Sequence, residues 1–271
     1  MNKIHPLATV SPNAKLGDNI EIGPYVFVDD HVEIGDGCKL LPHAVIFSYV
    51  KMGRDCTVFP GAVVGAVPQD LKYEGEVTWV EIGDRVTIRE CATINRGTKA
   101  SGKFLTKVGC DTLIMSYVHV AHDCEIGNHC ILVSHAALAG ETEVADWAIL
   151  GGGTLAHQFS HIGIHSMVGA GFKIVKDIPP YVLAGREPVS FEGVNRVGLS
   201  RRGFSEEKIN EIKDIYDTLY FKGMNVSDAL AYIEQNFPKT AERDTILSFI
   251  RASKRGIISK PRAPRKYGRN R

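Results

Sequence analysis

The chain has 271 residues, of which 44% are hydrophobic and 23% are charged, and its net charge is +1. This length suits one large domain or a main domain with an appendage, and the composition excludes disorder over most of the chain. There is no run of 18 apolar residues, and residues 1–6 lack the apolar stretch of a secretory signal. We therefore expect a cytoplasmic protein without an integral membrane segment.

An aliphatic residue or Met recurs at every sixth position over residues 4–64, 82–94 and 108–174, with Ala156 as the one weak member. A period of six fits no helix, whose apolar face recurs every three to four residues. It fits a flat strand followed by a corner, so that three hexads close one triangular coil of 18 residues. The sequence therefore predicts a β-solenoid, a parallel β-helix built from hexapeptide repeats.

The repeat is interrupted at residues 67–79 and 99–107, which we interpret as loops that project from corners of the solenoid. Long excursions from a rigid scaffold often carry function. We expect the solenoid to occupy residues 1–190 and a small α-helical domain to occupy residues 191–258. A basic tail follows at 259–271, and it is expected to be extended and solvated.

The helical domain is predicted from a change of pattern after the hexads stop. Ser205 suits the N-cap of a first helix, a second helix can start after Ser227, and a third near Thr240.

The residue four positions after each aliphatic residue is mostly small or β-branched. Four cysteines share this position, and we interpret them as buried fillers and not as metal ligands or a nucleophile: Cys38, Cys56, Cys124 and Cys130. Glycine often follows the aliphatic residue directly, which we attribute to the turning of the backbone.

Seven of the ten histidines lie between residues 119 and 165. Steps of 18 residues should stack His122, Gly140 and Gln158 in one vertical line on the same face of the solenoid, with His119 at the corner just before that face and His157 beside Gln158. A second stack should contain the residues His129, Trp147 and His165. We expect this second stack at the surface and assign it no role.

His122 followed by Asp123 suggests acid–base catalysis beside a groove. A neutral imidazole can take a proton from a substrate hydroxyl near pH 7, and a carboxylate can fix its tautomer. The N–H of Gly140 can stabilise an oxyanion because no side chain blocks approach to it. Two alternatives stay open at this point: a zinc site built from His119, His122 and a neighbour's histidine, and a catalytically silent scaffold.

The hexads, the loop 69–73, and the segments 121–124, 157–159 and 199–204 together resemble the UDP-N-acetylglucosamine acyltransferase family of lipid A synthesis. The resemblance runs from the first hexad to about Ile258. It implies a left-handed parallel β-helix and a homotrimer with active sites between subunits.

The implied reaction moves a 3-hydroxyacyl chain from the phosphopantetheine of acyl carrier protein to the 3-hydroxyl of UDP-N-acetylglucosamine. The resemblance implies no metal and no other cofactor, and we expect no nucleic acid as a partner and no integral membrane segment. It makes His122 the general base, Asp123 its orienting carboxylate and Gly140 the oxyanion donor, while Ala170 would limit acyl length. The implied substrate-binding positions are Gln69, Asp70, Lys72, His119, His157, Gln158, Asn195, Arg201 and Arg202.

Three positions depart from the family pattern: Asn95 and Glu141 replace histidine, and Val197 replaces glutamate. The same fold also serves an N-acyltransferase of lipid A synthesis, which takes a glucosamine acceptor, and zinc-dependent carbonic-anhydrase-like hydratases. Both remain alternatives for this chain.

Overall fold

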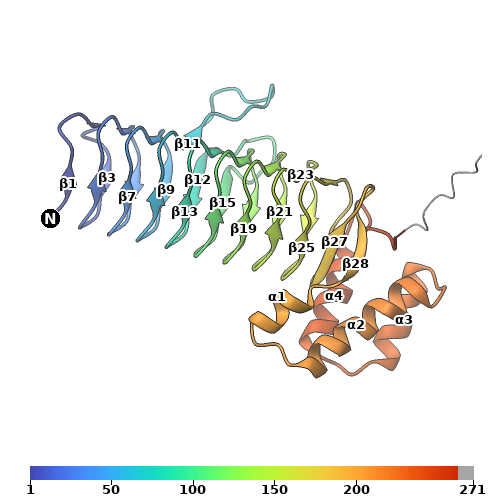
Figure 1. Ribbon diagram of the computed structural model, residues 1–271. Helices are drawn as coiled ribbons and strands as arrows, with labels where there is room; N and C mark the ends of the chain where they lie inside the picture. Colours follow the sequence, from blue (N-terminus) through green and yellow to red (C-terminus); the bar gives the residue numbers. More distant parts are fainter. Residues whose placement is uncertain (262–271) are drawn as a thin grey trace, which may run out of the picture.

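The computed structural model describes residues 1–261, so most of the expected basic tail lies outside the described residues. Short parallel strands build a three-sided prism, and the helices gather at its C-terminal end (Figure 1). Each side of the prism is one sheet, here called the first, second and third face in chain order.

The first face contains β1 (Lys3–Ile4), β4 (Glu21–Ile22), β7 (Lys39–Leu40), β10 (Thr57–Val58), β13 (Thr87–Ile88), β16 (Leu113–Ile114), β19 (Ile131–Leu132), β22 (Ile149–Leu150), β25 (Met167–Val168), β27 (Val182–Gly185) and β28 (Ser190–Val194). The second face contains β2 (Thr9–Val10), β5 (Phe27–Val28), β8 (Val45–Ile46), β11 (Val63–Ala66), β14 (Thr93–Asn95), β17 (His119–Val120), β20 (Ala137–Leu138), β23 (Leu155–Ala156) and β26 (Lys173–Ile174). The third face contains β3 (Lys15–Leu16), β6 (Glu33–Ile34), β9 (Val50–Met52), β12 (Trp79–Ile82), β15 (Leu105–Val108), β18 (Glu125–Ile126), β21 (Glu143–Val144) and β24 (His161–Ile162).

The six-residue period sets both the register and the core. Each strand pairs with the one a full coil later, as Ile131 pairs with Ile149 and Lys3 with Glu21. The repeated aliphatic residue points into the prism and is buried through almost the whole stack, even at the weak position Ala156. Ile4 is exposed because it belongs to the first coil, which has no neighbour on one side. The solenoid predicted from the sequence is confirmed.

The four cysteines in the small-residue position are fully buried, which confirms the prediction that they fill space beneath the corners. Burial raises the pKa of Cys124 and of Cys130 to about 12, so both thiols stay protonated near neutral pH.

The corners turn through a different residue from the one that we expected. The residue three positions after the inward aliphatic has a positive φ angle, as at Tyr25 (59°) and Asp123 (61°). Glycine directly after the aliphatic has another cause, the close approach of neighbouring coils. A Cβ on Gly35 would lie 2.7 Å from the carbonyl carbon of Gly53. The attribution of these glycines to backbone turning was therefore wrong.

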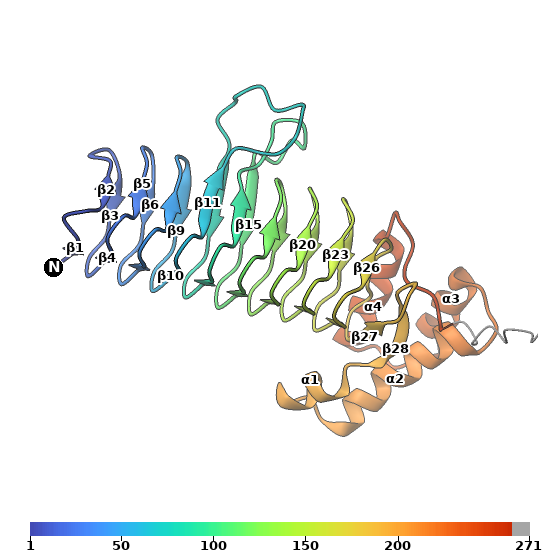
Figure 2. The same cartoon turned by 45° about the horizontal axis from the view of Figure 1, so that its top comes forward.

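Two loops leave the prism where the hexads fail. The first spans residues 67–78 between β11 and β12, and the second spans residues 96–104 between β14 and β15. Because β15 begins at Leu105, the second loop ends earlier than the expected 107. Figure 2 shows the two loops rising together from one edge of the prism, where the backbone N–H of Lys99 donates to a carboxylate oxygen of Glu76.

Beyond the coils, β28 runs antiparallel to β27 and carries the sheet four residues past the expected boundary at 190. Helices α1 (Arg196–Arg201), α2 (Glu206–Phe221), α3 (Val226–Asn236) and α4 (Ala241–Ala252) follow. Ser205 and Thr240 cap α2 and α4 as predicted, whereas α3 begins slightly early, with Asn225 as its cap. Helix α1 was not predicted. In residues 1–261 no helix is both long and apolar enough to span a membrane.

Candidate active site

The histidine stack predicted from the sequence is present, but it lies at the corner between the second and third faces and not on a face. The expected place of His119 was also wrong, because His119 lies in β17 on the second face and not at a corner. The backbone N–H of Glu141 donates to the carbonyl of His122, and that of Phe159 donates to the carbonyl of Gly140. His122, Gly140 and Gln158 therefore occupy the same corner position in three consecutive coils. Both loops leave the prism at this corner as well, between the same two faces.

His122 and Asp123 form a close pair at this corner. Nδ1 of His122 lies 2.8 Å from Oδ2 of Asp123, whose side chain is fully buried. The second loop surrounds the carboxylate, because the backbone N–H of Thr98 and the hydroxyls of Thr98 and Ser101 all donate to it, at 2.7–2.8 Å. Burial alone would raise the pKa of Asp123, but the hydrogen bonds from His122, Ser101 and Thr98 outweigh it and hold that pKa below its ordinary value.

An ionised Asp123 determines the state of the imidazole. A carboxylate can only accept, so the proton of a neutral His122 resides on Nδ1 and leaves Nε2 as a free acceptor. The hydrogen bond that His122 donates to Asp123 raises the pKa of His122 against the effect of burial, and the charges of Asp123, Asp70 and Glu141 act in the same direction. The pKa of His122 is therefore raised, so its imidazole loses its proton at a higher pH than an ordinary histidine does.

Gly140 packs directly against the imidazole. A Cβ at this position would lie 2.5 Å from Cε1 and 2.6 Å from Nε2 of His122, so only glycine leaves the ring where it stands. Its backbone N–H makes no hydrogen bond within residues 1–261. The hydrogen bonds between coils do not need this N–H, since proline occupies the same position of the hexad at another corner, at Pro24 and Pro42. One free N–H therefore lies beside the base.

His119 and His157 flank the stack but have partners of their own. Nδ1 of His119 lies 2.8 Å from Oγ1 of Thr93, and burial lowers the pKa of His119 so that the ring is neutral. Nδ1 of His157 lies 3.0 Å from the carbonyl oxygen of Gln158.

The first loop brings one predicted residue to the base. Oδ2 of Asp70 lies 3.9 Å from Nε2 of His122. The neighbouring Gln69 and Lys72 are exposed, and the backbone N–H of Lys72 donates to Oδ1 of Asp70 at 3.0 Å.

Three predicted residues lie at a different corner, between the third and first faces. The guanidinium of Arg202 stacks over Trp147 at 5.1 Å, and its NH1 lies 3.3 Å from Nδ1 of His165. Burial and the charge of Arg202 lower the pKa of His165 to about 4. Arg201 is exposed at the end of α1. Asn195 is buried as the N-cap of α1, and its amide also donates to the carbonyl of His165.

The second stack is partly different from its prediction. His129, Trp147 and His165 do stack, with ring centroids 4.0 and 6.0 Å apart. The surface location was wrong for His165, which is only 9% exposed because Tyr181 and Phe204 cover it.

Ala170 is exposed at the remaining corner, between the first and second faces. Within one chain the structure therefore brings Asp70, His122 and Gly140 to one corner, with His119 next to it in β17, but leaves Arg202 and Ala170 at the two other corners.

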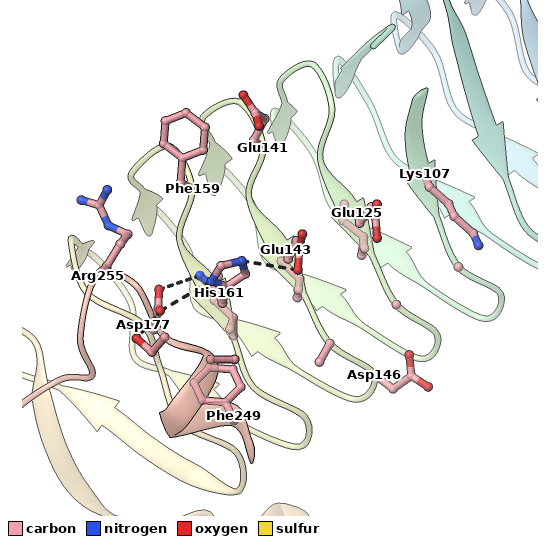
Figure 3. Close-up of a pocket in the computed structure, with 18 of the residues that line it drawn as sticks. Lys107, Glu125, Glu141, Glu143, Asp146, Phe159, His161, Asp177, Phe249 and Arg255 are labelled. Carbon is pink, nitrogen blue, oxygen red and sulfur yellow. Dashed lines mark hydrogen bonds and ion pairs between the residues drawn. The ribbon is translucent and has the colours of Figure 1, made fainter. Parts of the chain in front are cut away.

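The third face carries a groove of about 990 Å³ that begins at Glu141 and Phe159, each one residue beyond a member of the stack (Figure 3). It ends against α4, where His161 lies between Glu143 and Asp177. In the described part of the chain, no three His, Cys, Asp or Glu residues are arranged to hold a metal ion.

Sequence reasoning did not identify Thr98 and Ser101, which hold Asp123. The only signal was their place beside and within an interruption of the repeat. Among the departures from the family pattern, Asn95 donates to the carbonyl of Val67 at the base of the first loop, and Val197 is exposed on α1.

Comparisons with known proteins agree with the resemblance. A family described as UDP N-acetylglucosamine O-acyltransferase, domain 2, matches residues 177–258, and the bacterial transferase hexapeptide family matches residues 13–48 and 105–140. An acyl-[acyl-carrier-protein]–UDP-N-acetylglucosamine O-acyltransferase of Thiobacillus denitrificans is 50% identical over 258 residues, which cover 95% of this chain and 100% of that one.

Solved structures that resemble this chain belong to the same family of enzymes. The UDP-N-acetylglucosamine acyltransferase of Bacteroides fragilis is 49% identical with a TM-score of 0.92, over 94% of this chain and 99% of that one. The UDP-N-acetylglucosamine acyltransferase of Francisella novicida is 37% identical with a TM-score of 0.91, over 95% of this chain and 94% of that one. The fold is thus the expected left-handed parallel β-helix with a C-terminal helical region. The chain belongs to the UDP-N-acetylglucosamine O-acyltransferase family.

Proposed function

We propose that the protein transfers a 3-hydroxyacyl chain from acyl carrier protein to the 3-hydroxyl of UDP-N-acetylglucosamine, the first step of lipid A biosynthesis. The names of the relatives support this substrate pair. The observation that carries the chemistry is the His122–Asp123 pair beside the free N–H of Gly140.

In the proposed mechanism, Nε2 of His122 takes the proton from the sugar hydroxyl. The oxygen attacks the thioester carbonyl, so that a C–O bond forms, and the N–H of Gly140 donates to the oxyanion of the tetrahedral intermediate. Collapse of the intermediate breaks the C–S bond, and the thiolate of phosphopantetheine leaves with the proton from His122. Asp123 keeps the imidazole in one tautomer and stabilises its charged form between the two proton transfers.

Substrate binding is proposed from the resemblance and supported by position. Asp70 lies beside His122, His119 lies in the strand just before it, and His157 and Gln158 lie two coils beyond it. Arg201 and Arg202 are cations suited to the diphosphate. Gln69, Lys72 and Asn195 complete the proposed set, although the amide of Asn195 already has two backbone partners in this chain.

A homotrimer is proposed because two faces of the prism present apolar side chains that need covering. On the first face these are Leu113, Ile131, Ile149 and Met167, and on the second face they are Phe27, Val45, Val63 and Leu155. The third face presents mainly charged side chains, among them Lys51, Glu81, Lys107, Glu125 and Glu143. A first face packed on a neighbour's second face buries both apolar surfaces.

The same packing completes the site. It brings the corner with Arg202 next to the neighbour's corner with His122, and it places Ala170 near the three-fold axis, at the end of the apolar interface. An acyl chain between the two faces would then end near Ala170. Light scattering should give three times the chain mass of 29.7 kDa.

Acyl transfer itself tests the proposal. Purified protein is given UDP-N-acetylglucosamine and a panel of 3-hydroxyacyl carrier proteins, and ester product is measured by mass spectrometry. Product only with a glucosamine acceptor would instead support the N-acyltransferase alternative. A cytoplasmic location stays a prediction.

A further inference from the structure

A buried arginine beneath the first loop has no acidic partner. Arg96 follows β14 and is only 8% exposed, yet no ion pair in residues 1–261 includes it. Its guanidinium stacks over Tyr49 at 5.2 Å, NH2 donates to the hydroxyl of Tyr73 at 3.2 Å, and Nε has no hydrogen-bond partner. Burying a cation without a counter-ion is costly, so a role other than ion pairing should explain it.

Apart from the stack on Tyr49, the contacts of Arg96 lead to the first loop. Its backbone N–H donates to the carbonyl of Ala66, at the start of the loop. Its side chain reaches Tyr73 in the middle of the loop, and the Tyr73 hydroxyl in turn donates to the carbonyl of Glu76 at 3.0 Å. The side chain of Arg96 thus joins the prism to the middle of the loop, and the Tyr73 hydroxyl continues this connection to Glu76.

Tyr73 is tied to Asp70 within a single tight turn. The backbone N–H of Tyr73 donates to the carbonyl of Asp70, and the N–H of Lys72 donates to the Asp70 carboxylate, both at 3.0 Å. These two bonds fix the orientation of Asp70 relative to the Tyr73 ring. A displacement of that ring therefore moves the carboxylate that lies 3.9 Å from Nε2 of His122.

We propose that Arg96 and Tyr73 are positioning residues that hold the Asp70 carboxylate beside Nε2 of His122. The inference rests on the proposed acyl transfer for its kinetic consequence, but the holding of the loop is independent of activity. The planar guanidinium of arginine serves this purpose because its face can stack on Tyr49 while an N–H at its edge donates to the Tyr73 hydroxyl.

Four variants test the proposal: Tyr73→Phe, Asp70→Asn, the double variant of both, and Arg96→Lys. Tyr73→Phe removes only a hydroxyl, and we expect about a 10-fold fall in kcat/KM because a misplaced group near the chemistry is costly. The double variant should match Asp70→Asn within about 2-fold, since the two changes remove the same effect. Tyr232→Phe, on an exposed tyrosine of α3, is the matched control and should leave kcat/KM unchanged.

The pH profile gives a readout that a general loss of stability would not move. The charge of Asp70 raises the pKa of His122. Tyr73→Phe and Asp70→Asn should therefore both move the acid limb of kcat/KM to lower pH. Multiplicative effects of the two substitutions, or an unmoved limb for Tyr73→Phe, would overturn the inference.

Limited proteolysis separates this inference from the proposed function. Lys72 is exposed in the first loop and offers trypsin a cleavage site. Release of the loop in Tyr73→Phe and Arg96→Lys should speed cleavage at Lys72 at least about 5-fold, while Tyr232→Phe leaves it unchanged. Unchanged cleavage would refute the positioning role even if the protein transferred no acyl group. A wild type without ester product would refute the function alone.

Discussion

Gly140→Ala tests the contact between the corner glycine and the base. The added Cβ would lie 2.5 Å from Cε1 of His122, whereas carbon atoms in contact normally lie about 3.5 Å apart or more. The imidazole must therefore move by about 1 Å, which lengthens its 2.8 Å hydrogen bond to Asp123. A displacement of this size at the reacting group predicts about a 10²-fold loss of kcat/KM, or about 2.7 kcal/mol of transition-state stabilisation.

The substitution separates the base from the oxyanion donor, because alanine keeps the backbone N–H. Gly140 does not have a positive φ angle, so alanine is compatible with its backbone. Initial rates of ester formation should be compared for Gly140→Ala, His122→Ala and the double variant, with thermal unfolding of each. The double variant should be no slower than His122→Ala by more than about 2-fold. A Gly140→Ala protein with wild-type kcat/KM would refute the reasoning.

Three further predictions concern other parts of the structure. Asp123→Asn should lower kcat/KM by at least about 10²-fold and move its acid limb to lower pH, because the carboxylate raises the pKa of His122 and activity is lost as the base is protonated. Asp177→Ala should lower the free energy of unfolding by about 3 kcal/mol, measured with urea, since this buried carboxylate accepts from the backbone N–H of His161 and from Ser253 after α4. Ala170→Met should shift the preferred donor to a shorter 3-hydroxyacyl chain in the carrier-protein panel.

One of these three has a matched control, and each has an outcome that would contradict it. For Asp177→Ala it is Asp217→Ala, which removes only an exposed pair with Lys213 and should change stability little. Unaltered unfolding of Asp177→Ala would contradict the proposed tie between α4 and the prism. For Asp123→Asn and Ala170→Met, an unmoved acid limb and an unmoved chain-length preference, respectively, would contradict the assigned roles.

The prism could be predicted from the sequence because its order is local. Every coil repeats one rule, an inward aliphatic at each sixth residue, and the stacking of His122 on Gly140 follows from an 18-residue step. The meaning of the glycines was harder to read. Gly35 must be glycine because the backbone of the next coil leaves no room for a Cβ there. This contact lies between coils, so the sequence of one hexad does not show it.

The parts that escaped prediction depend on long-range contacts in irregular segments. Thr98 and Ser101 reach Asp123 only because the second loop folds back over its corner. The hairpin of β27 and β28 lacks the six-residue period, and α1 is too short for a helical stripe. The burial of His165 likewise depends on Phe204, which lies outside the repeat.

The central claim is that His122 acts as the base of acyl transfer to a sugar nucleotide. The most direct measurement compares wild type with His122→Ala, using UDP-N-acetylglucosamine and 3-hydroxyacyl carrier proteins of several chain lengths. We expect ester at the 3-hydroxyl from the wild type and a loss of at least about 10²-fold in the variant. A His122→Ala protein that forms ester at the wild-type rate would contradict the account.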